Sequence, residues 1–207
     1  DILNLTQEKI IYDIHTKYLS AGADIIETNT FNSTKTSQLD YKCEDFSYDL
    51  NFSGGKIARK AVDDFLIKNP NETKYVAGVL GPTNRTCSMS PDVNNPGFRN
   101  ISFDELYSDY EKSSEALIEA GVDVIMVETV FDTLNAKAAL SSIGGACKKS
   151  KKNVPIMISA TITDLSGRTL SGQTIEAFYN SILHVDPLSV GLNCALGPKE
   201  LEPYIIE

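Results

Sequence analysis

Two carboxylates and one thiol are the residues of this sequence whose types and positions best suit chemistry. Glu27 and Glu128 each close a short apolar run, and Cys194 closes another, directly after Asn193. A carboxylate at a strand end can serve as a general acid or base, a metal ligand or the partner of a substrate ammonium group. A thiolate there can serve as a nucleophile or a zinc ligand. The plainer alternatives are a carboxylate paired on the rim or capping a helix, and a small buried thiol.

The other three cysteines are weaker candidates. Cys87 lies in a long polar loop at 82–100 and could approach Cys194, so a two-cysteine site is conceivable. Nothing in the sequence completes a zinc set, because no second cysteine lies at a matching spacing. We expect Cys43 in a loop and Cys147 in a helix, both away from the chemistry.

The histidines and one polar stretch also have ordinary explanations. His15 is expected as a satisfied packing residue in the middle of a helix, and His184 at a helix end. The stretch 166–174 is rich in hydroxyls and glycine. It is either an anion-binding loop that offers backbone amides or an ordinary surface loop.

Apolar runs of strand length alternate with helix-length segments along the whole sequence. Strands are expected at residues 23–30, 75–81, 122–129, 155–162 and 188–194. Helices are expected at residues 6–20, 49–68, 102–120, 133–149 and 173–184, with a last one from residue 198. Nearly continuous apolar strands joined by helices are typical of a parallel sheet that is buried on both faces.

Local signals mark several helix ends. Thr6 is expected to cap the first helix, and Ser102 with Glu105 forms a capping-box pattern. Gly22 and Gly121 each follow a helix and precede a strand, in the related stretches AGAD and AGVD. They are expected to end those helices in a left-handed conformation.

Two α/β architectures fit this order, a TIM-type (β/α)8 barrel and an open doubly wound sheet. The first turns lack the glycine-rich nucleotide-binding patterns, which disfavours the open sheet. Polar residues follow every strand, as at the mouth of a barrel enzyme. We therefore expect an incomplete barrel, since only five βα units of eight can be counted.

Composition excludes several classes of protein. The net charge of −9 and the lack of a basic stripe argue against nucleic-acid binding. No apolar run approaches the roughly 18 residues of a membrane span. The four cysteines are widely spaced, which is typical of reduced thiols in a cytoplasmic protein.

Long motifs give the sequence a specific resemblance. It resembles the homocysteine S-methyltransferase domain of cobalamin-dependent methionine synthases, in order and over nearly the whole length. The matching stretches are residues 21–34, 75–86, 90–94, 127–139, 155–159, 161–178 and 191–198. The last of these contains the motif GLNC, and the first contains ETNTFNST.

The resemblance implies a fold, an activity and a set of site residues. That domain is a (β/α)8 barrel in which three cysteines bind zinc, and homocysteine binds the zinc as a thiolate and takes a methyl group from methylcobalamin. Cys194 matches the first zinc cysteine, and Glu128 matches the carboxylate that holds the homocysteine ammonium group. Asn193 and Glu27 lie in matching motifs near the substrate. The implied partners are homocysteine and the cobalamin and methyltetrahydrofolate domains of a longer parent chain.

The sequence also departs from this pattern. The other two zinc ligands of the family are an adjacent cysteine pair, and no Cys-Cys occurs here. Residues 1–207 are therefore expected to be a partial domain comprising strands two to six of the barrel, inactive on its own. The alternatives are a homocysteine methyltransferase that uses a betaine or sulfonium donor, and a fragment without catalysis.

Overall fold

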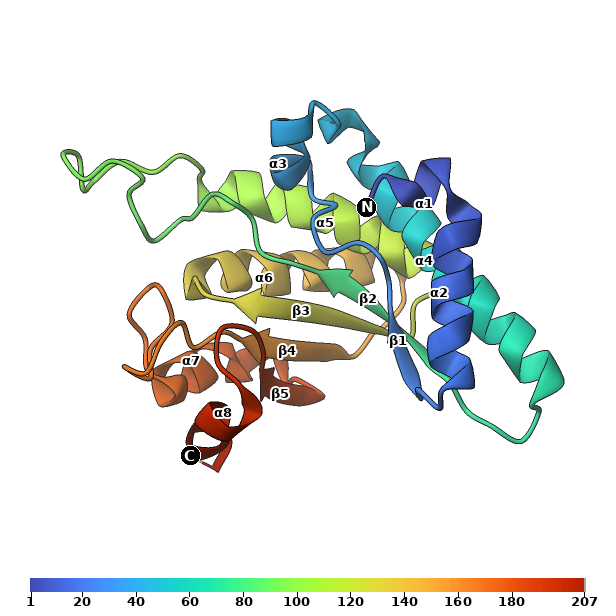
Figure 1. The fold of residues 1–207 in the computed structure, drawn as a ribbon. Helices are drawn as coiled ribbons and strands as arrows, with labels where there is room; N and C mark the ends of the chain where they lie inside the picture. Colours follow the sequence, from blue (N-terminus) through green and yellow to red (C-terminus); the bar gives the residue numbers. More distant parts are fainter. Residues whose placement is uncertain (207) are drawn as a thin grey trace.

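A computed structural model describes residues 1–206. Its centre is one parallel sheet of five strands in the order β1-β2-β3-β4-β5, which does not close on itself (Figure 1). The strands are β1 (Ile25–Glu27), β2 (Tyr75–Leu80), β3 (Val124–Val130), β4 (Ile156–Ala160) and β5 (Ser189–Leu192). Neighbours that follow one another in sequence and run parallel are the arrangement of a barrel wall, as expected from the sequence.

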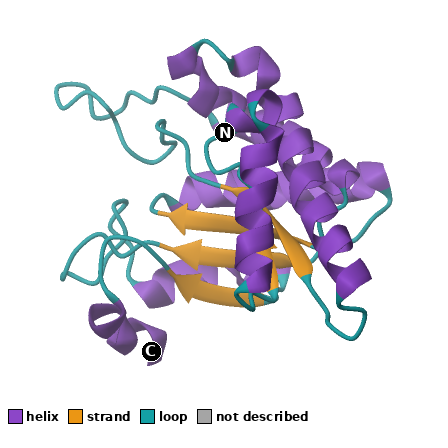
Figure 2. Cartoon of the chain, turned by 45° about the vertical axis from the view of Figure 1, so that its right-hand side comes forward, coloured by secondary structure: helices purple, strands orange, loops and turns teal. Residues whose placement is uncertain are grey.

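Helices connect the strands (Figure 2), and α4 and α5 contact β2 while α6 contacts β3. The α-helices are α1 (Leu3–Thr6), α2 (Glu8–Ser20), α3 (Lys35–Gln38), α4 (Ser47–Lys68), α5 (Phe103–Ala120), α6 (Thr133–Ser150), α7 (Ile175–Ile182) and α8 (Pro198–Ile206). Three short 3-10 helices are η1 (Leu39–Tyr41), η2 (Glu44–Phe46) and η3 (Leu183–Val185). No helix in the described part is both long enough and apolar enough to cross a membrane.

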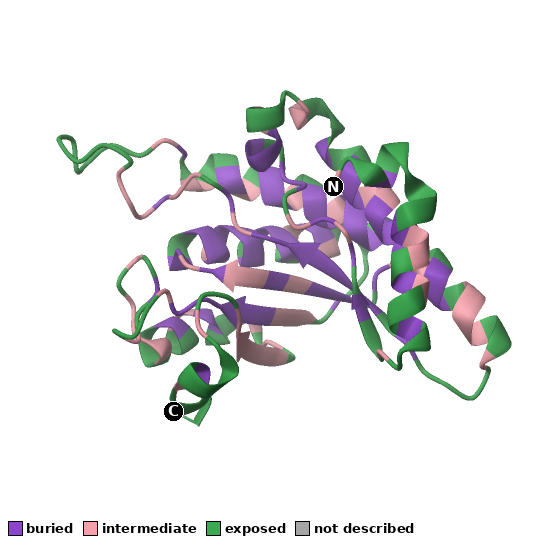
Figure 3. Ribbon diagram, viewed as in Figure 1, coloured by how far each residue is buried: buried purple, intermediate pink, exposed green. Residues whose placement is uncertain are grey.

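The two faces of the sheet differ in burial (Figure 3). Ile125 and Ile158 face α5 and α6 and are almost fully buried. On the opposite face Met126 and Met157 are only partly buried, and Ile25 is 45% exposed. The expectation of a sheet buried on both faces is therefore wrong for the described residues, because the five strands form a curved wall whose inner face is not filled.

Two glycines let α4 pack closely against its neighbours. A Cβ atom at Gly54 would lie 2.6 Å from the Nδ2 of Asn4 and from the Cγ2 of Thr30. A Cβ atom at Gly55 would lie 2.6 Å from the Cβ of Ala120, at the end of α5. The two glycines are thus where other parts of the chain approach the α4 backbone.

A third glycine lies where two backbone segments cross. A Cβ atom at Gly81, just after β2, would overlap the carbonyl oxygen of Phe31 in the loop that follows β1. The carbonyl of Gly81 also accepts a hydrogen bond from the Tyr110 hydroxyl of α5 at 2.9 Å. The loops that follow the first two strands are therefore fixed to each other and to α5.

Most of the expected helix ends are confirmed. Ser102 and Glu105 form a full capping box, and Gly22 and Gly121 adopt left-handed φ values of 102° and 95°. The expected cap at Thr6 is wrong. Thr6 is the last residue of α1, where its hydroxyl donates to the carbonyl of Ile2, and α2 begins two residues later without a side-chain cap.

Candidate functional site

The candidate site lies at the carboxyl ends of β3, β4 and β5. Glu128 lies near the end of β3, and Asn193 and Cys194 directly follow β5. Ser159 of β4 lies between them in the sheet. Because parallel strands present their carboxyl ends at one edge, these residues meet although 66 residues separate Glu128 from Cys194 in sequence.

A β-bulge in β3 shapes this edge. β3 has one residue more than β4 between the pairs Val127–Ile158 and Val130–Ala160. Within this interval Thr129 adopts the left-handed conformation with φ 58°. The extra residue interrupts the alternation of the strand, so Glu128 and Thr129 both contact the same partner directly after β5.

That partner is the side-chain amide of Asn193. Its Oδ1 accepts hydrogen bonds from the backbone N–H of Thr129 at 3.2 Å and from the Ser159 hydroxyl at 2.8 Å. Its Nδ2 donates to Thr129 Oγ1 at 2.8 Å and lies 3.3 Å from both Glu128 Oε2 and Cys194 Sγ. Asn193 therefore joins three strands in one network, which we call the Asn193 network: Glu128, Thr129, Ser159, Asn193 and Cys194.

The thiol of Cys194 is presented outward by an unusual backbone. Cys194 and Ala195 both have positive φ, at 61° and 55°, so the chain turns sharply at the end of β5. Cys194 is exposed, and its Sγ lies 3.8 Å from Thr129 Oγ1. The alternative that Cys194 is a small buried thiol is therefore wrong. Its exposed position suits a thiol that binds a metal ion or another ligand.

The electrostatics around Glu128 favour a cation. Burial raises the pKa of the Glu128 carboxyl above its usual range, and the nearby charge of Glu27 raises it further. No lysine, arginine or histidine forms an ion pair with Glu128 among residues 1–206. A substrate ammonium group at this place would offset both unfavourable effects.

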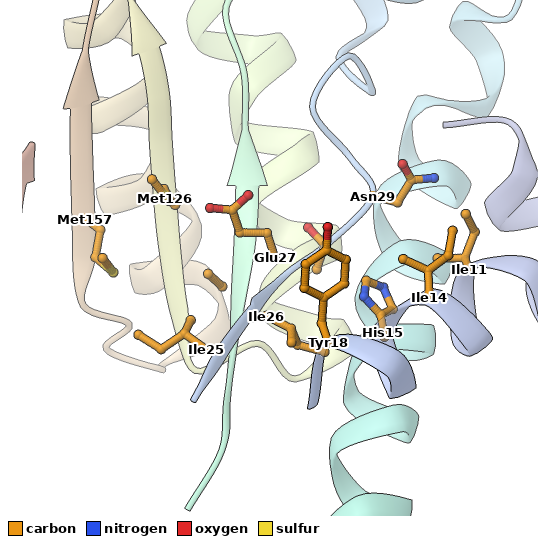
Figure 4. Close-up of a pocket in the computed structure, with 12 residues that line it drawn as sticks. Ile11, Ile14, His15, Tyr18, Ile25, Ile26, Glu27, Asn29, Met126 and Met157 are labelled. Carbon is orange, nitrogen blue, oxygen red and sulfur yellow. The ribbon is translucent and has the colours of Figure 1, made fainter. Parts of the chain in front are cut away.

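Glu27 lies apart from the hydrogen bonds of the Asn193 network. It is exposed and lines a hollow of about 540 Å³ beside β1, together with His15 and Tyr18 of α2 (Figure 4). Met126 of β3 also lines this hollow, on the inner face of the sheet. Glu27 thus acts on Glu128 only through its charge, which raises the pKa of the Glu128 carboxyl. The expected role of Glu27 in substrate binding stays a prediction.

The residues that follow β2 form a separate cluster. Asn135 of α6 donates to Thr83 Oγ1 at 3.3 Å and accepts from the backbone N–H of Cys87 at 2.9 Å. Cys87 is buried, its Sγ lies 3.8 Å from the carbonyl oxygen of Ile101, and burial raises its pKa to about 11. These partners differ from those of Cys194, so the structure does not support a site built from both cysteines.

The remaining candidates occupy ordinary positions. Cys43 lies in a loop, and Cys147 lies in α6. His184 lies in η3 and is exposed, as expected for a helix end. His15 is buried in α2, but its Nε2 has no hydrogen-bond partner, so the expectation of a satisfied histidine is wrong.

The glycine- and hydroxyl-rich stretch is an ordinary loop. The backbone N–H groups of Thr169, Ser171 and Gly172 donate to carbonyl oxygens of the protein. The backbones of Arg168 and Thr174 form an isolated antiparallel β-bridge. The Arg168 guanidinium donates to the carbonyl of Gly172. Because these amides are already occupied, the structure favours the plain interpretation over an anion site.

The described residues supply only part of a zinc site. Across residues 1–206, no group of three or more His, Cys, Asp and Glu side chains is arranged to hold a metal ion. Cys194, exposed at a strand end, has the chemistry of a single zinc ligand. One thiol does not meet the three or four ligands that zinc requires, so this set does not fit a complete zinc centre.

Comparison with known proteins identifies the family. The family model for homocysteine S-methyltransferase matches residues 1–207. The chain belongs to the homocysteine S-methyltransferase family, and the domain is of the methyltransferase type. The parallel sheet, its strand order and the polar residues at its carboxyl edge agree with that assignment.

Solved structures of one homocysteine methyltransferase share the fold. The metallated form of MmuM from Escherichia coli has a TM-score of 0.76 and 20% sequence identity, covering 96% of this chain and 67% of that one. Its oxidised form has a TM-score of 0.61 and 15% identity, covering 96% of this chain and 84% of that one. The chain therefore spans about two thirds of the length of the metallated structure.

Proposed function

We propose that this chain is the homocysteine-binding part of a methionine synthase, in which a homocysteine thiolate accepts a methyl group from methylcobalamin. The observation that carries the proposal is the Asn193 network, which places a carboxylate and an exposed thiol around one amide. An amino acid that carries both an ammonium group and a sulfur atom matches this pair of side chains. Family membership and the long motifs around Glu128 and Cys194 support the same substrate.

In this proposal Glu128 holds the substrate ammonium group. Its carboxylate is half-buried, and its pKa is raised by burial and by Glu27. A cation bound there regains the electrostatic energy that the carboxylate lost on burial. Asn193 fixes the direction of the carboxylate through the contact at 3.3 Å.

Cys194 provides one zinc ligand in this proposal. Zinc, when bound, lowers the pKa of a coordinated thiol and so makes a nucleophile at neutral pH. The described residues contain no group of three or more possible metal ligands. The family resemblance implies that two further cysteines complete the site. The proposal further places the protein in the cytoplasm, with partner domains for cobalamin and methyltetrahydrofolate on the same chain.

The test of the metal assignment is the variant Cys194→Ala in the purified full-length protein. We expect zinc content to fall to background and methyl transfer to homocysteine to fall at least about a hundredfold, because a zinc ligand is lost. Cys147→Ala, in α6, is the matched control and should change neither quantity. Unchanged zinc content in Cys194→Ala would rule out Cys194 as a ligand.

A second experiment identifies the methyl donor. The family assignment and the fold fit a betaine or sulfonium donor equally well. The purified full-length protein is therefore assayed with homocysteine and either methylcobalamin, glycine betaine or a methylsulfonium compound. Methionine formed from methylcobalamin supports the proposal, whereas turnover with only one of the other donors contradicts it. No turnover with any donor would favour a fragment without catalysis.

A further inference from the structure

Thr129 has a backbone conformation that its residue type disfavours. Its φ of 58° lies in the left-handed region, which β-branched residues rarely adopt. Glycine or asparagine would fit this position with less strain. The conformation is held by Asn193, which accepts from the backbone N–H of Thr129 at 3.2 Å and donates to its hydroxyl oxygen at 2.8 Å.

The strained backbone places the Thr129 hydroxyl between the two reactive side chains. Thr129 Oγ1 lies 3.3 Å from Glu128 Oε2 and 3.8 Å from Cys194 Sγ. A threonine has one O–H group, so it donates to either the carboxylate or the sulfur at one time. The Asn193 amide is shared in the same way, because its two N–H groups face three acceptors.

We propose that Thr129 is a positioning residue that couples the ammonium end of the substrate site to the sulfur end. The inference rests on the proposed function and deepens it. When a substrate ammonium group occupies the Glu128 carboxylate, the Thr129 hydroxyl turns away from Glu128 and donates to Cys194 Sγ. Binding of the amino-acid end of the substrate then fixes the orientation of the thiol.

Ser159 of β4 holds the Asn193 amide in place. It is buried, and its hydroxyl donates to Asn193 Oδ1 at 2.8 Å. This bond fixes which way the Asn193 amide faces, so that its N–H groups point toward Glu128, Thr129 and Cys194. The Thr129 hydroxyl therefore has one fixed partner, the Asn193 amide. Its two alternative partners are Glu128 and Cys194.

Three substitutions at Thr129 separate this role from a purely structural one. Thr129→Val removes the hydroxyl and keeps the branched shape, Thr129→Ser keeps the hydroxyl, and Thr129→Gly removes the hydroxyl and relieves the backbone. We measure KM and kcat for homocysteine, and the Tm, of each variant in the purified full-length protein. Thr129→Val and Thr129→Gly should each lose about tenfold or more in kcat/KM, because a hydrogen bond to a charged group is lost. Thr129→Ser should stay within about threefold.

The glycine variant is decisive because its two readouts move in opposite directions. We expect its Tm to rise, because strain is removed, while its kcat/KM falls with that of Thr129→Val. A kcat/KM at the level of the unsubstituted protein in Thr129→Val would overturn the proposal. So would a glycine variant whose kcat/KM recovers, since that result would show that the backbone alone matters.

A stability measurement keeps this test apart from that of the proposed function. If the unsubstituted full-length protein does not methylate homocysteine, the proposed function fails. The contact is then tested by the Tm values of Thr129→Val, Asn193→Ala and the double variant. Tm shifts that are not additive support the coupling through Asn193, and additive shifts overturn it.

Discussion

At the scale of single residues, the charge on Glu128 works against the folded state. Burial and the charge of Glu27 both raise the pKa of the Glu128 carboxyl, so folding favours its protonated form. The stability linked to this shift is fully present below the unfolded pKa and is lost as the pH rises through the folded pKa. At neutral pH the protein therefore carries an electrostatic cost at Glu128, the residue to which the proposed function assigns the substrate ammonium group.

Removing that charge should stabilise the protein. Glu128→Gln is expected to raise the free energy of unfolding at pH 7 by less than about 1 kcal/mol, because solvent screens a half-buried charge. The gain should disappear in acid, where the carboxyl is protonated in both the folded and the unfolded state. Urea denaturation at pH 7 and at pH 4 measures both effects.

Glu27→Gln is the matched control for this prediction. It removes the second cause of the shift, so the pKa of Glu128 should fall toward its usual value while burial still acts on it. A Glu128→Gln variant that is less stable than the parent at pH 7 would contradict the electrostatic explanation.

Residue types at strand ends indicated part of the candidate site, and the fold supplied the rest. Glu128, Asn193 and Cys194 could be found because each directly follows or closes an apolar run. The conformation of Thr129 could not be found, since a threonine at the end of a strand signals extended backbone. Its left-handed conformation depends on a bulge against β4 and on Asn193, neither of which is visible in the local sequence.

At the scale of elements, the packing of α4 depends on missing side chains. Asn4 is buried and donates to the carbonyls of Asn29 and Leu50 at 2.8 and 3.0 Å. It lies directly over Gly54, so α1, the loop after β1 and α4 meet at one point. The loop that positions the residues after Glu27 is therefore anchored by a glycine contact.

Filling that contact should be harmful. Gly54→Ala is expected to lower the free energy of unfolding by about 1–3 kcal/mol, because Asn4 and Thr30 have to move. The usual gain from replacing a helical glycine by alanine, about 1 kcal/mol, should not compensate. Chemical denaturation of the variant measures the change.

A glycine in α6 is the matched control. No atom lies within 4 Å of a Cβ built on Gly144. Gly144→Ala should therefore stabilise the protein by about 0.5–1 kcal/mol. If both alanine variants changed stability in the same direction, close packing at Gly54 would not be the cause.

The order and type of the main elements follow from the sequence because apolar runs and helix caps are local signals. All five strands, and the helices expected between them, occur where the runs were expected. Thr6 misled because a threonine suits a helix end as well as a cap, and its hydroxyl bonds backward to Ile2. The short helices α3, η1 and η2 were missed, since Asp109 of α5 holds the start of α3 through two backbone N–H groups.

At the scale of the whole molecule, the sheet of the described residues is open, and one exposed thiol, that of Cys194, lies at its carboxyl edge. The five strands run from β1 to β5 without closing, and the described residues bring a single cysteine to the polar edge. One sulfur ligand cannot hold zinc tightly. The 207-residue chain should therefore bind zinc more weakly than a protein that has a complete set of zinc ligands.

Zinc titration of the 207-residue chain checks this expectation. We expect no tight, stoichiometric binding by isothermal titration calorimetry, because the described residues contain no group of three or more His, Cys, Asp or Glu side chains arranged to hold a metal ion. The same titration of Cys194→Ala should give an indistinguishable curve. Tight binding of one zinc ion per chain, lost in Cys194→Ala, would show that residues 1–207 alone assemble a site.

The crossing at Gly81 limits how this family can change over evolutionary time. The backbone after β2 touches the carbonyl of Phe31, and the hydroxyl of Tyr110 holds the same peptide. Any side chain at this position would push apart the loops that follow two neighbouring strands. Relatives that route these loops in the same way should therefore have glycine here. A different residue would indicate a lineage in which the loop after β1 takes another path and the surroundings of Glu27 have changed.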